Sequence, residues 1–263
     1  MGLGAWVKAS SNVLLSTLFE PPCAACKQPL IHPLDGAVCD DCWASLRLAP
    51  RLIERYGSDH AIAWAGAADH YDGRMKDIIH SLKYERRRSI ARPLGALMRE
   101  CGAELLRGAD CVVPVPLHPR REYDRGFNQA DDLAQQLGLK VMPLLKRIIF
   151  TQSQIELPKH QRKENVRNAF AVNKPKGLLP QGFNGQAGAN EPEGSLLQGL
   201  TRDSCGNEPL GSFPSIVVLV DDVSTTGATL EACARVLKDA GVKEVRALTA
   251  ARVVAGSRHI ATI

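Results

Sequence analysis

The sequence predicts an α/β protein in which a parallel sheet is flanked by helices and preceded by a small cysteine module. Three observations support this prediction. Residues 216–220 form a continuous apolar run, which leads through a loop of small residues into a helical pattern ending near Leu237. Residues 112–116 contain a second strand pattern, and two Cys-x-x-Cys pairs lie near the N-terminus. Continuous runs rich in β-branched residues are typical of strands buried on both faces of a sheet.

The segment after the apolar run has the residue types of a sugar-phosphate site. Asp221 and Asp222 follow the run directly, and the loop comprises Val223, Ser224, Thr225, Thr226, Gly227, Ala228 and Thr229. Hydroxyls and the free N–H groups of a helix start can hold a phosphate, and glycine allows close backbone approach. Two carboxylates beside a phosphate need vicinal hydroxyls or Mg²⁺ as partners. The alternative is an ordinary buried strand followed by a capped turn.

The cysteine pairs predict a structural zinc site. Cys23 and Cys26 are separated from Cys39 and Cys42 by twelve residues, a spacing that suits a zinc-ribbon-like loop. Four thiolates would close the coordination sphere and leave no position for a catalytic water. Two disulfides or four reduced thiols are the alternatives.

Composition sets the broad class of the protein. Apolar residues make up 44% of the 263 residues, and the net charge is +5. This charge is compatible with a polyanionic ligand but is smaller than that of a dedicated nucleic-acid binder. We find no apolar run that could span a membrane and no export signal, so we expect a cytoplasmic protein without membrane insertion.

The N-terminal half contains helical patterns and a basic cluster. Residues 1–20 predict a short amphipathic helix with a packing role, and its apolar positions include Trp6, Leu18 and Phe19. Residues 72–107 follow helical spacing in two runs. The basic cluster between these runs consists of Lys83, Arg86, Arg87, Arg88 and Arg92. A solvated surface is the ordinary explanation of such a cluster, and a phosphate-facing patch is the alternative.

The segment after the 112–116 strand pattern is a second candidate for ligand contacts. The backbone near Pro116, together with Arg125 and Gln129, could receive a pyrophosphate. Tight turns at the prolines and helix capping by Asn128 are equally good explanations.

Two later segments lack the pattern of a packed core. Residues 151–170 are strongly polar and could form a lid or an exposed helix. Residues 174–214 hold eight glycines and five prolines, which predicts a disordered insertion. We therefore expect an N-terminal helix and zinc module in residues 1–50, and one α/β domain in residues 60–263 that carries the insertion.

The strand and loop at 216–231 resemble the ribose-phosphate motif of type I phosphoribosyltransferases. With the other motifs, the chain resembles the ComF (competence protein F) family of phosphoribosyltransferase-like proteins. The motifs that support this resemblance are the Cys₄ knuckle, residues 82–84, 113–117 and 125–129, Gln154, Arg162, Asn165 with Val166, Phe170, and residues 220–229. The departure is the long 174–214 segment.

The resemblance implies a bacterial cytoplasmic protein that handles incoming single-stranded DNA during natural transformation. Asp221 and Asp222 would hold the ribose hydroxyls of phosphoribosyl pyrophosphate with Mg²⁺, and residues 224–229 would hold its 5′-phosphate. Pyrophosphate would lie near Pro116 with Arg125 or Lys83. If the protein is an enzyme, a nucleophile displaces pyrophosphate from C1′, although the sequence names no acceptor. The alternative is a binding module or adapter for single-stranded DNA or a helicase-like partner of the DNA-uptake machinery.

Overall fold

The computed structural model describes residues 3–47, 52–149, 168–173 and 213–253, and contains a five-stranded mixed sheet with the order β1-β2-β7-β6-β3. The strands are β1 (Leu52–Arg55), β2 (Trp64–His70), β7 (Glu244–Arg252), β6 (Ile216–Ser224) and β3 (Cys111–Pro114). All neighbouring pairs are parallel except β1 and β2, which are antiparallel. The predicted α/β class is therefore confirmed, with an antiparallel edge strand that the sequence patterns did not indicate.

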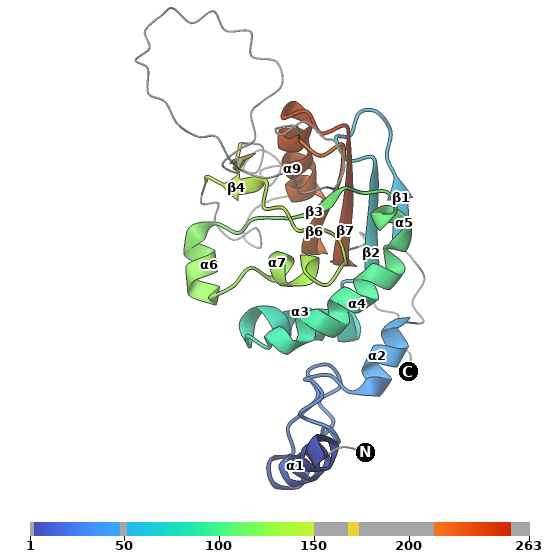
Figure 1. The fold of residues 1–263 in the computed structure, drawn as a ribbon, viewed down its shortest axis with the longest axis vertical. Helices are drawn as coiled ribbons and strands as arrows, with labels where there is room; N and C mark the ends of the chain where they lie inside the picture. The colour runs from blue at the N-terminus through green and yellow to red at the C-terminus, as the bar shows by residue number, and fades with distance from the viewer. Residues whose placement is uncertain (1–2, 48–51, 150–167, 174–212, 254–263) are drawn as a thin grey trace, which may run out of the picture.

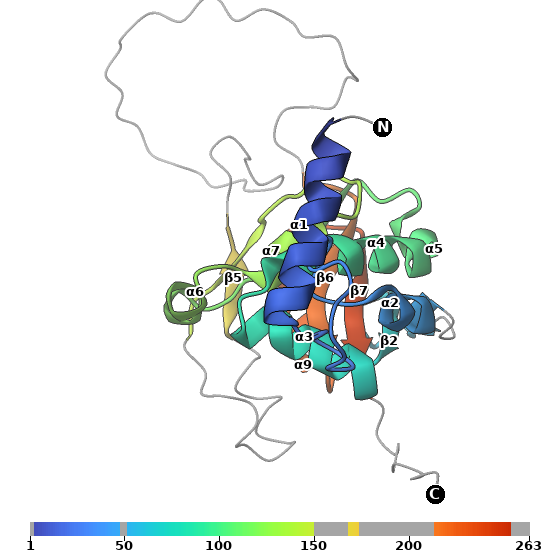
Figure 2. The same cartoon turned by 90° about the horizontal axis from the view of Figure 1, so that it is seen from below.

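Helices cover both faces of this sheet (Figures 1 and 2). One core contains buried residues of α3 (Gly73–Tyr84), α4 (Ala91–Cys101) and α7 (Gln129–Ala134). The other contains those of α9 (Ala228–Asp239) and the two-stranded sheet of β4 (Leu145–Arg147) and β5 (Phe170–Val172). Short connecting elements are η1 (Arg88–Ile90), α5 (Ala103–Leu106) and α6 (Pro119–Arg125).

The apolar run of β6 is buried on both faces, as its sequence predicts. Val218 and Val220 belong to the core under α3, α4 and α7, whereas Val217 and Leu219 belong to the core under α9. Each of these four residues has 0% exposure. The strand continues beyond the apolar run to Ser224, because its pairing with β7 continues to that residue. Both acids therefore lie within the strand.

The N-terminal module packs against the α3 and α4 side of the domain. It contains α1 (Leu3–Phe19) and α2 (Asp40–Arg47), and its buried residues Cys23, Cys42 and Leu46 join the same core cluster as Ile78 and Leu82 of α3. The hydrophobic core is thus continuous from the cysteines to α3.

The predicted packing role of the apolar residues of α1 is wrong for the described structure. Trp6 is 65% exposed and Phe19 is 73% exposed. The helix is instead held through polar contacts: the amide of Leu34 donates to Oδ1 of buried Asn12 at 2.9 Å, and Lys8 forms an ion pair with Asp35.

Several predicted features lie outside the described residues. These are the predicted insertion at 174–214, apart from its last two residues, and the polar segment at 151–170, apart from its last three. Within the described part of the chain, no helix has the length and apolarity needed to cross a membrane.

Candidate functional site

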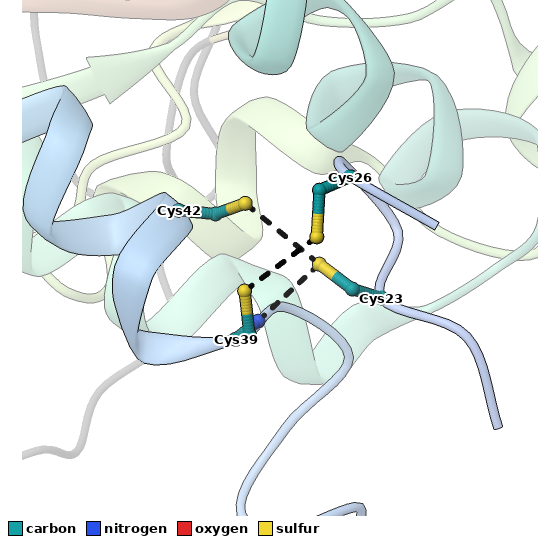
Figure 3. A group of neighbouring side chains, drawn as sticks. All are labelled: Cys23, Cys26, Cys39 and Cys42. Carbon is teal, nitrogen blue, oxygen red and sulfur yellow. Dashed lines mark hydrogen bonds between the residues drawn. The ribbon is translucent and has the colours of Figure 1, made fainter. Parts of the chain in front are cut away.

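The four cysteines of the N-terminal module converge on one point (Figure 3). Their sulfur atoms all lie within 4.8 Å of one another. The Sγ–Sγ distance is 4.0 Å between Cys23 and Cys42, and 3.7 Å between Cys26 and Cys39. Tetrahedral Zn²⁺ with Zn–S bonds of about 2.3 Å separates its sulfur ligands by about 3.8 Å. The cluster can therefore hold a zinc ion, and all four thiols are free of disulfides.

The surroundings of this cluster lower the pKa of one of the four thiols. Burial opposes ionisation of Cys23, but backbone N–H groups, including that of Cys39 at 3.3 Å, lower the pKa of the Cys23 thiol to about 7. Burial raises the pKa of Cys39 and Cys42. A dication would offset the cost of several buried thiolates, as expected of a structural metal site.

The two acids of β6 project to opposite sides of the sheet, because successive residues of a strand alternate between its faces. Asp222 lies near Lys83 and Tyr71, on the side of α3. Asp221 lies within electrostatic reach of Cys233 in α9 and Arg147 in β4. The two carboxylates are adjacent in the sequence, but the fold places them in different environments.

Lys83 and Asp222 form an ion pair at the end of β6. Nζ of Lys83 lies 2.8 Å from Oδ2 of Asp222, and the side chains are only 16% and 4% exposed. Burial alone would lower the pKa of Lys83, but the charges of Asp222 and Asp221 raise that pKa above its ordinary value. Lys83, which is expected from the sequence to contact pyrophosphate, thus contacts Asp222, one of the two acids expected to hold the ribose.

The fold disfavours ionisation of the Asp221 carboxyl group. Its burial, followed by the adjacent charge of Asp222, raises the pKa of Asp221 to about 7, although Lys83 opposes this shift. Oδ1 of Asp221 accepts a hydrogen bond from the amide of Asp222 at 2.8 Å. A nearby cation would favour the ionised form of this carboxyl.

The loop after the acids has the geometry of a helix start. Gly227 adopts φ of +73°, and an added Cβ would meet nothing within 4 Å among the described residues. Oγ1 of Thr226 accepts a hydrogen bond from the amide of Ala228 at 3.4 Å. Thr225 and Thr226 are exposed, whereas the partly buried loop residues are Val223, Ser224, Gly227, Ala228 and Thr229. Thr225 and Thr226 are therefore the most accessible residues of the loop that follows Asp221 and Asp222.

The residues predicted after β3 form a connected group. The side chain of Asn128 donates to the carbonyl of Val115 at 3.1 Å and accepts from Ala130 at 3.0 Å, so it caps α7. Arg125 hydrogen-bonds the side chain of buried Gln129.

The guanidinium of Arg125 also links this group to α3. It lies 5.7 Å from the ring centroid of Tyr84, which follows Lys83 in the chain. Pro116 is partly buried just beyond the end of β3. The structure thus brings Arg125 and Gln129 together beside Tyr84, at the end of α3.

Most of the predicted basic cluster is engaged within the protein. Arg88 pairs with Asp132 through two contacts of 2.8 and 2.6 Å, and Arg87 pairs with Glu85 at 3.0 Å. Arg86 donates to the carbonyl of Asp124 at 2.7 Å. These contacts favour a structural role for much of the cluster.

Two residues near the acids were missed by sequence reasoning. Arg147 lies near Asp221, and burial lowers the pKa of this arginine. Tyr71 lies near Lys83 and Asp222, and burial raises the pKa of its hydroxyl. The short strand β4, which contains Arg147, and the segment just after β2, which contains Tyr71, have no motif that could have identified these residues.

Comparisons with known proteins agree with this arrangement. Residues 198–261 match the family model described as "Phosphoribosyl transferase domain". The chain is 28% identical over 193 residues to "Competence protein F" of Haemophilus influenzae, covering 70% of each chain. It is 27% identical over 237 residues to "DNA utilization protein YhgH" of Salmonella typhimurium, covering 85% of this chain and 81% of that protein.

A more distant relative carries a related name. "Competence protein ComFC" of Streptococcus pneumoniae is 24% identical over 183 residues, covering 69% of this chain and 65% of that protein. Together with the cysteine cluster, the mixed sheet and the matched domain, these similarities support a ComF-family phosphoribosyltransferase-like protein.

Proposed function

We propose that this protein binds phosphoribosyl pyrophosphate, or a related ribose phosphate, together with Mg²⁺, and that it acts in DNA uptake. The observation that supports the proposal best is the ion pair of Lys83 with Asp222, beside Asp221 and the Gly227 loop. Carboxylates, an ammonium group and free helix N–H groups are the donors and acceptors that a sugar phosphate requires. The names of the relatives support the role in DNA uptake.

Each group would have a separate part in binding. Asp222 would accept hydrogen bonds from ribose hydroxyls while Lys83 stays beside it. Asp221 would gain most from Mg²⁺, because the fold resists its ionisation. Bound Mg²⁺ would supply positive charge that screens the pyrophosphate. The loop from Ser224 to Thr229 would hold the 5′-phosphate, and Arg125 would provide a cation on the α6 side.

The four cysteines would bind one structural zinc ion. Their sulfur geometry and the lowered pKa of the Cys23 thiol support this part of the proposal. With four protein ligands, the metal would stabilise the module and would take no part in chemistry at Asp221.

Calorimetric titration of phosphoribosyl pyrophosphate with Mg²⁺ into the zinc-loaded protein tests the proposed site. We expect binding by the wild type and a loss of at least about tenfold in Asp222→Asn, since a hydrogen bond to a charged group is removed. Asp239→Asn is a matched control, because Asp239 is exposed at the far end of α9. A wild type that does not bind, or an Asp222→Asn variant that binds equally well, would contradict the proposal.

A contact with single-stranded DNA is a second candidate function. Tyr84 and Tyr123 are 60% and 87% exposed, and Tyr123 shares α6 with Arg120, Arg121 and Arg125. Exposed aromatic rings beside cations are what stacking on single-stranded bases requires. Fluorescence anisotropy with labelled oligothymidine should show binding that weakens with salt and is lost in Tyr84→Ala/Tyr123→Ala. Equal binding by wild type and variant would remove this candidate.

A further inference from the structure

Helix α1 lies at the outer edge of the molecule, beyond α2 and α3 (Figures 1 and 2). Of the α1 side chains that the structure describes, Asn12 is the one that is buried, and its Oδ1 accepts a hydrogen bond from the amide of Leu34. Lys8 pairs with Asp35 in the same turn. The helix therefore faces the rest of the protein through the side that carries Asn12.

The opposite side of α1 is apolar and exposed. Because an α-helix turns by about 100° per residue, positions 10 and 14 lie opposite position 12. The residues on this side recur at helical spacing, and we call them the outer face: Trp6, Val7, Ser10, Val13, Leu14, Thr17 and Leu18. The five large apolar side chains of the outer face are each between 59% and 65% exposed. They form an apolar surface that nothing in the described part of the chain covers.

The sequence of α1 does not favour a helix that stands alone. Its central residues, Ser10, Ser11, Asn12 and Val13, are consecutive and have low helix propensity. Lys8 is the only charged residue of the helix, so no ion pair between successive turns can support it. In proteins, most of the stability of a helix comes from packing of its apolar face. A helix of this sequence therefore needs a partner for its outer face.

The lack of charge on the outer face favours a second copy of this chain over a lipid surface as the partner. Helices that lie on membranes carry Lys and Arg on their polar side, where these residues attract anionic lipids. The single cation of α1, Lys8, instead pairs with Asp35 within the protein. Two copies of an uncharged face can meet without charge repulsion and without leaving an ion unpaired.

The area of the outer face reaches what a specific interface needs. Five large apolar side chains that are each more than half exposed offer about 500 Å² in each copy, so a pair would bury about 1,000 Å² in total, the lower limit for a specific interface. A two-fold axis would use the same face in both copies. The contact would therefore close on itself and give a dimer rather than an open chain of molecules.

We propose that the outer face of α1 binds the outer face of a second copy of this chain, with the two helices antiparallel. About a two-fold axis near position 12, Trp6 would lie beside Thr17 and Leu18 of the second copy. Ser10 would face Leu14 of the second copy, so large side chains would meet small ones. A parallel pairing would place Trp6 against Trp6 and Ser10 against Ser10, which gives a clash at one contact and a gap at the other.

Sedimentation velocity of the zinc-loaded full chain at about 1 to about 100 µM tests the dimer. We expect the wild type to approach twice the 28.5 kDa mass of one chain, with a dissociation constant of about 10 µM. Leu14→Glu places a carboxylate in the apolar contact and should raise that constant at least about thirtyfold. Ala9→Glu is the matched control, because Ala9 is exposed about 140° around the helix from Leu14, and it should associate like the wild type. Both positions are exposed in the single chain, so both variants should keep the wild-type circular dichroism spectrum.

Two further measurements identify the contact. Because the outer face is uncharged, the dissociation constant should change by less than about twofold between about 0.1 and about 0.5 M NaCl. Ser10→Lys chains mixed with Leu14→Glu chains should form a mixed dimer, because the antiparallel pairing brings the two new charges together. Leu14→Glu should keep the wild-type affinity for phosphoribosyl pyrophosphate, since the dimer does not depend on the acids of β6.

Four results would overturn the proposal. A wild type that stays monomeric at about 100 µM would exclude the dimer. A dimer that persists in Leu14→Glu would lie on another surface, and Ser10→Lys and Leu14→Glu chains that do not associate would exclude the antiparallel pairing. A monomer that sediments with phosphatidylglycerol vesicles, and stops doing so in Leu14→Glu, would make a lipid surface the partner of the outer face.

Discussion

Replacement of Lys83 by methionine tests whether the ion pair at the end of β6 is structurally important. Methionine keeps an unbranched stem of similar length but removes the ammonium group. Asp222 would then keep a buried carboxylate, 4% exposed in the present structure, without its cationic partner. The adjacent carboxyl of Asp221 would also lose the positive charge that now opposes the rise of its pKa.

The expected cost is large for a single substitution. Removing one partner of a buried ion pair costs about 3–5 kcal/mol, because the other charge is left uncompensated. Lys83 retains 16% exposure, so water can replace part of the lost interaction. We therefore expect Lys83→Met to lower the free energy of unfolding by about 3 kcal/mol. In Lys83→Met/Asp222→Leu, where no charge remains unpaired, the loss should fall below about 1.5 kcal/mol.

Urea unfolding of the zinc-loaded protein at pH 8, followed by circular dichroism, measures these values. The pKa of Lys83 is raised above its ordinary value of 10.5, so its contribution is complete below that value and is lost only as pH rises through the folded-state pKa. Lys83 is therefore fully charged at both pH 7 and pH 9, but the cost of Lys83→Met should be larger at pH 9, because loss of its charge raises the pKa of Asp221 further above about 7. Lys76→Met, at an exposed position of the same helix, is the control and should change stability by less than about 0.5 kcal/mol. A Lys83→Met variant as stable as this control, or a double variant that shows the sum of both single losses, would refute the reasoning.

Three further predictions concern the acid, the metal and the loop. The pKa of Asp221 is raised from 3.8 to about 7, so the folded state holds this proton more tightly and stability falls as pH rises through that interval. Because Asp221 is half-buried, Asp221→Asn should gain about 1–2 kcal/mol at pH 8 and nothing at pH 4, as urea titrations at the two pH values can show. Elemental analysis should find one zinc ion per wild-type chain and none in Cys42→Ala, and chelation should lower the thermal midpoint by about 5–10 °C. At Gly227 an added methyl group has space, but φ is +73°, which disfavours residues other than glycine. Gly227→Ala should therefore lower the free energy of unfolding in urea by only about 1 kcal/mol. A decrease above about 3 kcal/mol would mean that the loop packs differently.

The strand and loop at the acids could be predicted because their sequence signals are local. Five apolar residues without a break require burial on both faces, and Val217 and Val218 are buried in different cores, as that pattern implies. The cysteine spacing was equally informative, since two Cys-x-x-Cys pairs restrict the thiols to a small volume. In both cases the chemistry follows from residues that are close in sequence.

The contacts that shape the acids could not be predicted, because they depend on distant segments. Lys83 and Asp222 are 139 positions apart in the chain, and no local pattern indicates that they meet. The edge strand β1 has only four residues and a half-exposed pattern, so it gives too short a signal. The apolar positions of α1 predicted packing, but polar contacts of Asn12 and Lys8 hold the helix, and side chains such as Trp6 stay exposed.

The continuous core between the cysteine module and α3 has a thermodynamic consequence. The core cluster that contains Cys23 and Cys42 also contains Leu82 of α3, the helix that carries Lys83 near its end. If metal binding restrains this helix, it will change the affinity of Asp222 for a ribose ligand by some factor. Reciprocity then requires that the ligand change the affinity of the thiols for the metal by the same factor. If zinc strengthens binding of the proposed sugar phosphate, the protein saturated with that ligand should retain zinc against a chelator more strongly than the ligand-free protein.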